Sequence, residues 1–273
     1  MKVTQFILDN RMRLGMVEGD LLWPLRFPGS MVDFIVAESK TGKTSEAPLS
    51  LRHVRFAPVV SNPTKIIALG LNYLDHAKES KGTVPKVPLI FAKFPNSLIG
   101  HNESIVWHRE ITKKVDFEAE LAVVMGKKAS RCAEKDALDY VFGYCCANDV
   151  SARDLQFGDG QWVRGKSLDT FCPLGPWIVT KDEVADPHSL AIKTTVNGTT
   201  MQDSSTAMMI FKIPQVIHFL ARHLTLMPGD IILTGTPHGV GAFREPSIYL
   251  KDGDEVVVEI EKVGRLVNTC KVL

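Results

Sequence analysis

The sequence predicts an α+β protein in which strands dominate. Short apolar segments recur along the chain and are separated by turns rich in glycine, proline and asparagine, which is the pattern of strands. One segment, residues 213–226 (IPQVIHFLARHLTL), instead has the apolar spacing of a helix. The order of elements is irregular, with no repeated strand–helix–strand unit, so we expect a mostly-β core of mixed strands rather than a doubly wound parallel sheet.

The composition is that of an ordinary globular protein. The 273 residues are 45% hydrophobic and 23% charged, and the formal net charge is +1. This length suits one large domain, or one domain with a small appendage. The balanced charge predicts no nucleic-acid partner and no acidic-lipid partner, and the apolar runs are too short to cross a membrane.

The N-terminus and the cysteines predict a reduced intracellular protein. The first twenty residues lack the apolar region of a secretory signal, and they contain acids that argue against a mitochondrial transit peptide. Five cysteines, an odd number, show no Cys-x-x-Cys spacing. We predict a cytoplasmic location, with the mitochondrial matrix as the alternative if a transit peptide has been removed.

Residues 1–60 are predicted to form a separate unit, in which the strand and helix signals are weaker. Residues 1–8 and 21–27 are typical of short strands, and residues 31–38 of a short helix. A turn signal, Ser61-Asn62-Pro63, follows this unit. We therefore place a domain boundary near residue 60.

Residues 61–273 carry a denser succession of elements. Asn197-Gly198 predicts a tight hairpin within residues 190–202, and residues 252–272 predict a second hairpin. The remaining expectations are a helix or lid over residues 72–82, a Pro-rich extended segment over 84–97, a helix running into a strand over 133–149, and strands over 65–72, 120–128 and 231–234.

Three carboxylates in the stretch VDFEAELAVVMG, residues 115–126, are the first candidate for chemistry. If this stretch is one strand, Asp116, Glu118 and Glu120 lie on one face, at the entrance to an apolar core. Carboxylates at i and i+2 can bind one hard divalent cation through oxygen. The alternative is a solvated edge strand, which this motif alone favours.

Asp149 is the second candidate. It follows an apolar run ending in CCAN, so it lies at a predicted strand end and can supply a further oxygen ligand. Alternatively, Asp149 or Ser151 only caps the helix that follows.

His76 and Glu79 form the third candidate. They are three residues apart, so one helical turn places them on the same face. Glu79 can then orient the imidazole, and His76 can act as a general base on water. A surface helix with an incidental ion pair is the alternative.

Two further candidates are loops. Lys166 lies among glycines, aromatics and prolines, so it can be held to neutralise an oxyanion, unless it is simply an exposed lysine. The Gly-rich stretch LTGTPHGVG, residues 233–241, follows an apolar strand, and its N–H groups can cradle an anion. The alternative is that the glycines are needed only because the loop backbone adopts positive φ angles.

At these residues the chain resembles the fumarylacetoacetate hydrolase family. The motifs occur in the family's order over about residues 63–273: GLNYLDHAKE, FEAELAVVMGK, ANDVSARDLQ, GKSLDTFCPLGP, VNG and PGDIILTGTPHGVG. The resemblance implies a mixed β-roll or barrel core, a catalytic domain over residues 61–273 after a small α/β unit over 1–60, and a homodimer.

The resemblance also implies roles for single residues. Asp116 matches no ligand position, so we expect it beside the metal ligands or in solvent. The implied metal is Mg²⁺ or Mn²⁺, with Ca²⁺ in some members. The implied metal ligands are Glu118, Glu120 and Asp149, the catalytic residues are His76, Glu79 and Lys166, and the substrate-binding residues are Arg153, Gln156 and Thr236.

The function implied is that of a divalent-metal-dependent enzyme acting on small 2-oxo or β-diketo acids through an enolate held on the metal. Hydrolysis of a C–C bond in an acylpyruvate-like substrate is the first expectation. Keto–enol tautomerisation of oxaloacetate is nearly equal, because the same enolate serves both reactions. Oxaloacetate decarboxylation ranks third, and a non-enzymatic binding protein ranks last because no matched position is missing.

Overall fold

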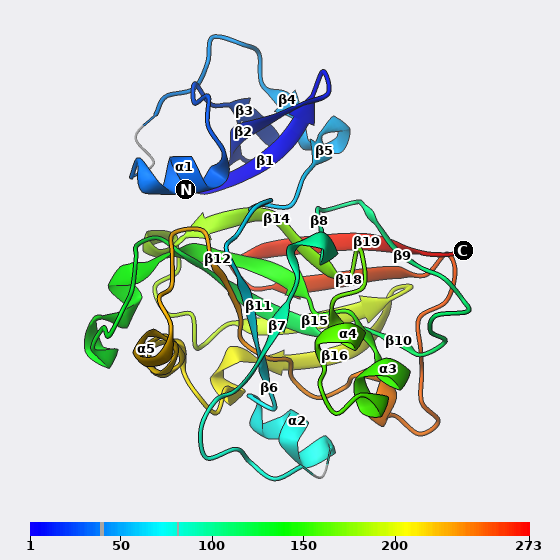
Figure 1. Cartoon of the computed structure of the whole chain (residues 1–273). Coiled ribbons are helices and arrows are strands. Elements are labelled where there is room, and N and C mark those ends of the chain that lie inside the picture. The colour runs from blue at the N-terminus through cyan, green and yellow to red at the C-terminus, as the bar shows by residue number, and fades with distance from the viewer. Residues whose placement is uncertain (39–40, 81) are drawn as a thin grey trace.

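The computed structural model describes residues 1–38, 41–80 and 82–273. Ser39, Lys40 and Lys81 lie outside these ranges, so the predicted lid over residues 72–82 is covered except at Lys81. Strands are the most frequent regular element of the described residues, and most of them lie in two sheets with a few short helices around them (Figure 1). The predicted mostly-β α+β fold is confirmed.

The N-terminal unit is an antiparallel sheet with one helix. The predicted strands correspond to β1 (Lys2–Leu8) and β3 (Leu21–Pro24), and the predicted helix to α1 (Met31–Val36). The sequence prediction missed β2 (Arg11–Glu18), in which polar residues interrupt the apolar positions. The short strands β4 (Leu49–Ser50) and β5 (Arg55–Phe56) and the 3₁₀ turn η1 (Leu51–His53) complete the unit.

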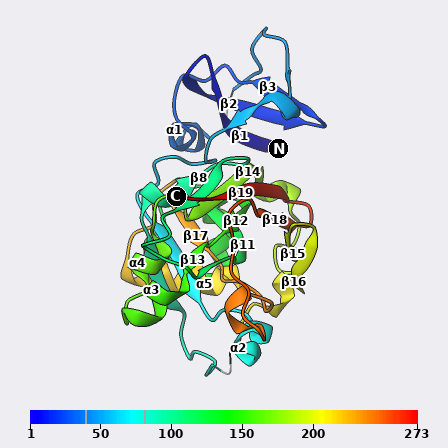
Figure 2. The same ribbon diagram turned by 90° about the vertical axis from the view of Figure 1, so that its right-hand side faces the viewer.

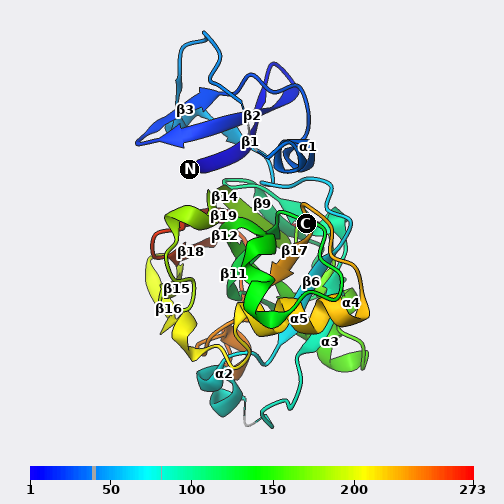
Figure 3. The same cartoon turned by 90° about the vertical axis from the view of Figure 1, so that its left-hand side faces the viewer.

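This unit shares a sheet with the rest of the chain. Two residue pairs, Lys2 with Val179 and Val3 with Ile178, join β1 to β14 (Cys172–Thr180) in antiparallel register. The views from either side both place the N-terminal unit at one end of the molecule and α2 (Leu74–Glu79) at the other (Figures 2 and 3). The boundary near residue 60 stays a prediction.

The large sheet passes through the centre of the molecule. Its strand order is β4-β3-β2-β1-β14-β12-β11-β17-β6-β7, with β5 and β8 paired at its side. Apart from the parallel pairs β17–β6 and β14–β8, neighbouring strands are antiparallel. The strands not yet bounded are β6 (Ile66–Gly70), β7 (Leu89–Lys93), β8 (Leu98–Ile99), β11 (Ala119–Met125), β12 (Val141–Asn148) and β17 (Ile231–Leu233).

Strand β11 is the core of this sheet, since all seven of its residues are buried. Its alternate side chains enter two separate apolar clusters, with Leu121 and Val123 in one and Ala122 and Val124 in the other. Both faces of the sheet are therefore covered here, which explains why the strand reads as a continuous apolar run. Any polar side chain near its start is forced away from water.

A second sheet packs beside the first and has the order β16-β15-β18-β19-β9. Asn197 and Gly198 have φ angles of 49° and 77°, which confirms the predicted hairpin turn. A two-stranded pair joins β10 (Val115–Asp116) to β13 (Ser151–Ala152). The strands of the second sheet are β9 (Ser104–Trp107), β15 (Ala191–Val196), β16 (Thr199–Ser205), β18 (Glu255–Ile260) and β19 (Gly264–Val272).

The helices are short and lie outside the sheets. The predicted helix near residue 213 is α5 (Ile213–His223), whose buried face includes Val216, Ile217 and Leu220. The helix predicted before residue 141 is instead the 3₁₀ segment η3 (Glu134–Tyr140). Among the described residues, no helix is long and apolar enough to span a bilayer. The other helical segments are α3 (Arg153–Gly158), α4 (Val163–Lys166), η2 (Pro95–Ser97), η4 (Lys181–Glu183), η5 (Thr206–Met208) and η6 (Gly241–Phe243).

Candidate active site

The acidic stretch 115–126 is not one strand, which corrects the first expectation from sequence. Strand β10 ends at Asp116 and β11 begins at Ala119, so the chain leaves the strand conformation between them. The three carboxylates consequently do not line a single face. Glu118 and Glu120 turn toward Asp149, whereas Asp116 has other partners.

Glu118, Glu120 and Asp149 form a buried acidic triad. One carboxylate oxygen from each lies within 4.8 Å of the other two, and the three residues are 6%, 0% and 0% exposed. The backbone N–H of Asp149 donates to the carbonyl of Glu118 at 2.9 Å, which fixes the end of β12 against the start of β11. The solvated-edge alternative is therefore wrong for this triad.

Asp149 does not cap a helix. Helix α3 begins at Arg153, and no side chain caps its N-terminus. The Asp149 carboxylate instead accepts hydrogen bonds from two buried lysines, at 2.6 Å from Lys93 Nζ and 2.6 Å from Lys166 Nζ. Its role is electrostatic, because it pairs with Lys166, which lines the cavity.

Lys166 is buried, and it is not an exposed loop lysine. It ends the short helix α4, and its Nζ donates to Glu118 Oε2 at 2.8 Å in addition to Asp149. Burial alone would lower the pKa of Lys166, but the charges of Asp149 and Glu118 outweigh it and raise this pKa. Lys166 therefore stays cationic inside the site.

Sequence reasoning missed Lys93, the second buried lysine. It is 1% exposed, and besides Asp149 it contacts the carbonyls of Val150 and Lys166. The available signal was a lysine at the end of the apolar segment LIFAK, where a charge without a buried partner would be expensive.

Asp116 holds a different part of the site. Its carboxylate accepts from Arg153 Nε at 2.8 Å and from the backbone N–H groups of Gly241 and Ala242 at 2.8 and 2.9 Å. Arg153 also reaches Glu118 Oε1 at 2.7 Å and donates to Gln156 Oε1 at 2.9 Å. The expectation that Asp116 lies beside the triad holds, and the solvent alternative does not.

Glu118 and Glu120 have opposite electrostatic environments. Burial would raise the pKa of Glu118, but the cations Lys166 and Arg153 lower it to about 2. For Glu120, burial and the negative charges of Asp149 and Glu118 raise the pKa well above its usual value. The triad therefore lacks positive charge on the Glu120 side.

The residues fit a hard divalent cation. Three carboxylates supply only oxygen ligands, which Mg²⁺, Mn²⁺ and Ca²⁺ prefer. Among the described residues, Glu120 Oε1 has no hydrogen-bond partner although it is buried, while its other oxygen accepts from Gly235 N–H at 2.6 Å. A cation would supply both the missing partner and the missing positive charge.

His76 and Glu79 form the predicted pair on α2. His76 Nδ1 lies 3.1 Å from Glu79 Oε2, and His76 is only 7% exposed. The other oxygen of Glu79 accepts from Gly239 N–H at 2.8 Å, so the pair is anchored to the loop after β17. A surface helix with an incidental ion pair does not describe this arrangement.

The Gly-rich loop does cradle anions, but they are the protein's own carboxylates. Gly235, Gly239 and Gly241 donate their N–H groups to Glu120, Glu79 and Asp116 respectively. Gly235 and Gly239 have φ angles of 91° and 97°, a region that favours glycine. Both interpretations of this loop from sequence therefore apply, because the positive φ angles orient the N–H groups toward the carboxylates.

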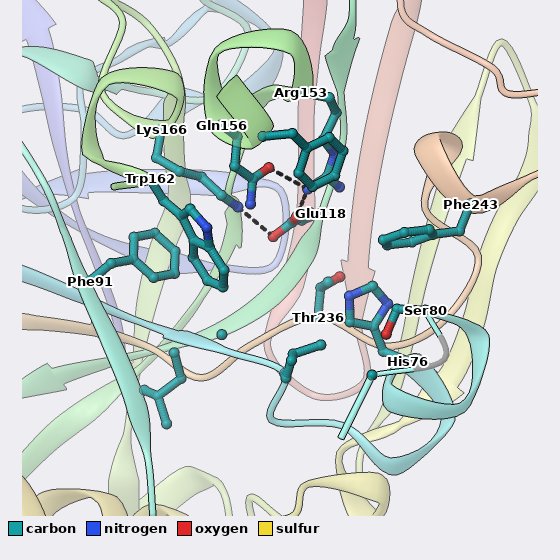
Figure 4. Close-up of a pocket in the computed structure, with 15 residues that line it drawn as sticks. His76, Ser80, Phe91, Glu118, Arg153, Gln156, Trp162, Lys166, Thr236 and Phe243 are labelled. Atoms are coloured by element: carbon teal, nitrogen blue, oxygen red, sulfur yellow. Dashed lines mark hydrogen bonds and ion pairs between the residues drawn. The ribbon is translucent and has the colours of Figure 1, made fainter. Parts of the chain in front are cut away.

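Several of these side chains line one cavity of about 220 Å³, whereas the predicted residues Glu79, Glu120 and Asp149 are not part of its lining (Figure 4). Glu118 and Lys166 lie at one end, and Trp162 stands beside them with Phe91. Thr236 lines the cavity and accepts a hydrogen bond from Gln202, a buried residue that sequence reasoning missed. The cavity brings together these predicted residues: His76, Glu118, Arg153, Gln156, Lys166 and Thr236.

Comparisons with known proteins identify the family of this chain. A family profile described as "Fumarylacetoacetate (FAA) hydrolase C-terminal" matches residues 65–271. The chain belongs to the fumarylacetoacetate hydrolase family. It is an enzyme of this family, as the motifs and their order predicted.

Three similar proteins show the range of activities in this family. The chain is 47% identical to "Oxaloacetate tautomerase Fahd2a, mitochondrial" from Rattus norvegicus over 249 residues, which cover 88% of this chain and 79% of that protein. A solved fumarylacetoacetate hydrolase from Exiguobacterium antarcticum matches with a TM-score of 0.88 and 36% identity, covering 100% of both chains. A solved maleylpyruvate hydrolase from Sphingobium sp. SYK-6 matches with a TM-score of 0.82 and 32% identity, again over 100% of both chains.

Proposed function

We propose that this enzyme is an oxaloacetate keto–enol tautomerase that depends on a divalent metal. The observation that carries the proposal is the juxtaposition of the acidic triad, Lys166 and the His76–Glu79 pair around one cavity. The 47% identity to a protein named as an oxaloacetate tautomerase supports this reaction over the C–C hydrolysis that we ranked first from sequence.

In this proposal Glu118, Glu120 and Asp149 hold Mg²⁺, with Mn²⁺ or Ca²⁺ as substitutes. When bound, such a cation supplies Lewis acidity, which stabilises negative charge on the oxygens of a 2-oxo acid. Lys166 adds a fixed positive charge at the same end of the cavity, where it stabilises the enolate oxygen. Gln156 and Thr236 orient the substrate carboxylate.

His76 moves the proton. Its Nδ1–H donates to Glu79, which leaves Nε2 as the acceptor. Nε2 takes a proton from C3 of the keto acid, the C–H electron pair forms the C2=C3 double bond, the C=O π pair moves onto the C2 oxygen, and Nε2 returns the proton to that oxygen. Glu79 keeps the imidazole in the required tautomer throughout, and the reverse sequence returns the keto form.

C–C hydrolysis is the second candidate, because the same His76–Glu79 pair can activate water. The similarity to a maleylpyruvate hydrolase supports it. The added requirement is a water molecule beside His76 and a substrate with a second carbonyl. Decarboxylation stays the third alternative.

A spectrophotometric assay separates these reactions. Enol-oxaloacetate and an acylpyruvate are each supplied with Mn²⁺, and loss of the enol absorbance is followed alongside pyruvate release. Fast conversion of enol-oxaloacetate without pyruvate supports the tautomerase. Cleavage of the acylpyruvate alone would transfer the assignment to a hydrolase.

The assembly and the location belong to the same proposal. Strand β7 is the last strand in the order of the large sheet, and its residues Leu89 and Ile90 are 41% and 39% exposed. An exposed apolar edge strand favours a second copy as partner, so we propose a homodimer. Light scattering after size exclusion tests this, and a monomer mass would contradict it.

The rat relative's mitochondrial name supports the matrix alternative to the cytoplasm.

A further inference from the structure

We infer that the cavity accepts 2-oxo acids bearing a planar apolar group on C3, such as an arylpyruvate, and tautomerises them as it does oxaloacetate. The tautomerisation part of this inference rests on the proposed function. The part that concerns the ligand's shape rests on the walls of the cavity alone.

One wall is aromatic and is assembled from two distant segments. Phe91 on β7 and Trp162 before α4 meet edge to face, with ring centroids 5.3 Å apart. Trp162 packs over Gly70, where an added Cβ would lie 2.5 Å from the indole ring. The absence of a side chain at Gly70 therefore makes room for the indole at the cavity.

The opposite wall also carries an aromatic ring. Phe243 lies 5.6 Å from the His76 ring, measured between centroids, and is 39% exposed. Phe157 also lines the cavity and is 61% exposed. Apolar side chains left open to water in a concave site are typical of surfaces that a ligand covers.

Positive charge lies next to the Phe91 side of the aromatic wall, where Lys166 Nζ is 5.2 Å from the centroid of the Phe91 ring. Among the lining residues that the structure describes, the cations Arg153 and Lys166 both lie against Glu118. A 2-oxo carboxylate placed there would project its C3 substituent between Trp162 and the Phe243 side. An aryl ring on C3 can stack in that space.

The test uses two ligands that differ only by a phenyl ring. Oxamate is an isostere of pyruvate, and N-phenyloxamate carries the same two-carbon acid with an aryl group attached. Titration calorimetry of the whole protein with Mn²⁺ measures both affinities. We expect N-phenyloxamate to bind about tenfold more tightly, equivalent to about 1.4 kcal/mol. Equal or weaker binding of N-phenyloxamate would overturn the inference.

Two variants locate the phenyl group. Trp162→Gln removes the aromatic wall at a partly exposed position, so the affinity ratio of the two ligands should fall toward one. Trp23→Gln, in the N-terminal unit, should leave that ratio unchanged. An unchanged ratio in Trp162→Gln would place the phenyl group elsewhere and overturn the assignment of this wall.

Activity separates this inference from the proposed function. Turnover of both enol-phenylpyruvate and enol-oxaloacetate supports both. Turnover of enol-oxaloacetate with no preference for N-phenyloxamate would leave the tautomerase proposal intact and remove the aryl specificity. A preference for N-phenyloxamate without turnover of either enol would retain the ligand class and remove the tautomerase.

Discussion

Lys93 and Asp149 form a fully buried ion pair, with Nζ 2.6 Å from Oδ1 and both side chains 0% exposed. Because Lys93 also contacts the carbonyls of Val150 and Lys166, one ammonium joins the end of β7, the segment after β12 and the end of α4. These are three of the segments from which the site is built. Lys93 is therefore a positioning residue, for which a direct test is available.

Replacing Lys93 by methionine should destabilise the protein by about 3 kcal/mol, since removing one partner of a buried pair is costly and leaves Asp149 with Lys166 as its remaining cation. Urea unfolding measures this loss. Added Mn²⁺ should raise the melting temperature of Lys93→Met more than that of the parent protein, because a bound cation would restore positive charge beside Asp149.

Lys65→Met is the matched control. Lys65 pairs with buried Asp230 at 2.5 Å, but its side chain is 31% exposed, so water can reach the vacated position. We expect a smaller loss of stability and no change in the response to Mn²⁺. An equal response in both variants would remove the link between Lys93 and the acidic triad.

Glu120→Gln should separate metal binding from folding. Glutamine keeps the acceptor for Gly235 N–H and resembles the protonated acid that the raised pKa favours in the absence of a cation. The free energy of unfolding without metal should therefore change by less than about 1 kcal/mol. Affinity for Mn²⁺, measured by calorimetry, should fall at least about tenfold because a charged ligand is lost.

Glu110→Gln tests whether that loss is specific. The Glu110 side chain is 72% exposed and lies outside the triad, so its variant should bind Mn²⁺ like the parent protein. Parent-like Mn²⁺ affinity in Glu120→Gln would exclude Glu120 as a ligand.

His76→Asn should lower kcat for enol-oxaloacetate by about 100-fold while leaving Mn²⁺ affinity unchanged, since a positioned general base typically contributes at least this much. Glu79→Gln should have a smaller effect, because it orients the imidazole without carrying the transferred proton. Steady-state kinetics with each variant measures both losses.

His238→Asn provides the control for this region. His238 also contacts a carboxylate of α2, Asp75 Oδ2 at 2.9 Å, but its side chain is 48% exposed and does not line the cavity. Its variant should retain kcat. A parent-like kcat in His76→Asn would require another residue to move the proton.

His101 should make stability depend on pH. Its Nδ1 accepts from Val267 N–H at 3.0 Å, and burial together with the positive charge of Arg265 lowers its pKa to about 4. The unfolded chain, with a pKa near 6.5, binds this proton first, so stability should fall by about 3 kcal/mol as the pH drops from about 6.5 to about 4.

Urea unfolding at several pH values between 7 and 4 measures that slope (about three or four points suffice). His101→Asn keeps an acceptor for Val267 N–H but cannot take up a proton, so its curve should be flatter in this window. Identical slopes for the two proteins would assign the acid sensitivity to other groups.

Local sequence determined most of the strands and much of the site. Alternation and turn chemistry are local properties, so the Asn197-Gly198 hairpin and the spacing of His76 and Glu79 could be read directly. The order of the motifs also identified the family. Strand β2 was missed because charged residues interrupt its apolar positions. This pattern suits a strand with one face buried and the other face in solvent.

Only the tertiary structure decided which partners the charges have. The sequence placed Asp116, Glu118 and Glu120 on one strand, but the break before β11 sends Asp116 to Arg153 and the other two acids to Asp149. Lys93 was not chosen from sequence because its partners are 56 or more residues away. Charge pairing acts through space at a few ångströms, so it depends on the packing of distant segments, whereas strand and turn preferences are contained in neighbouring residues.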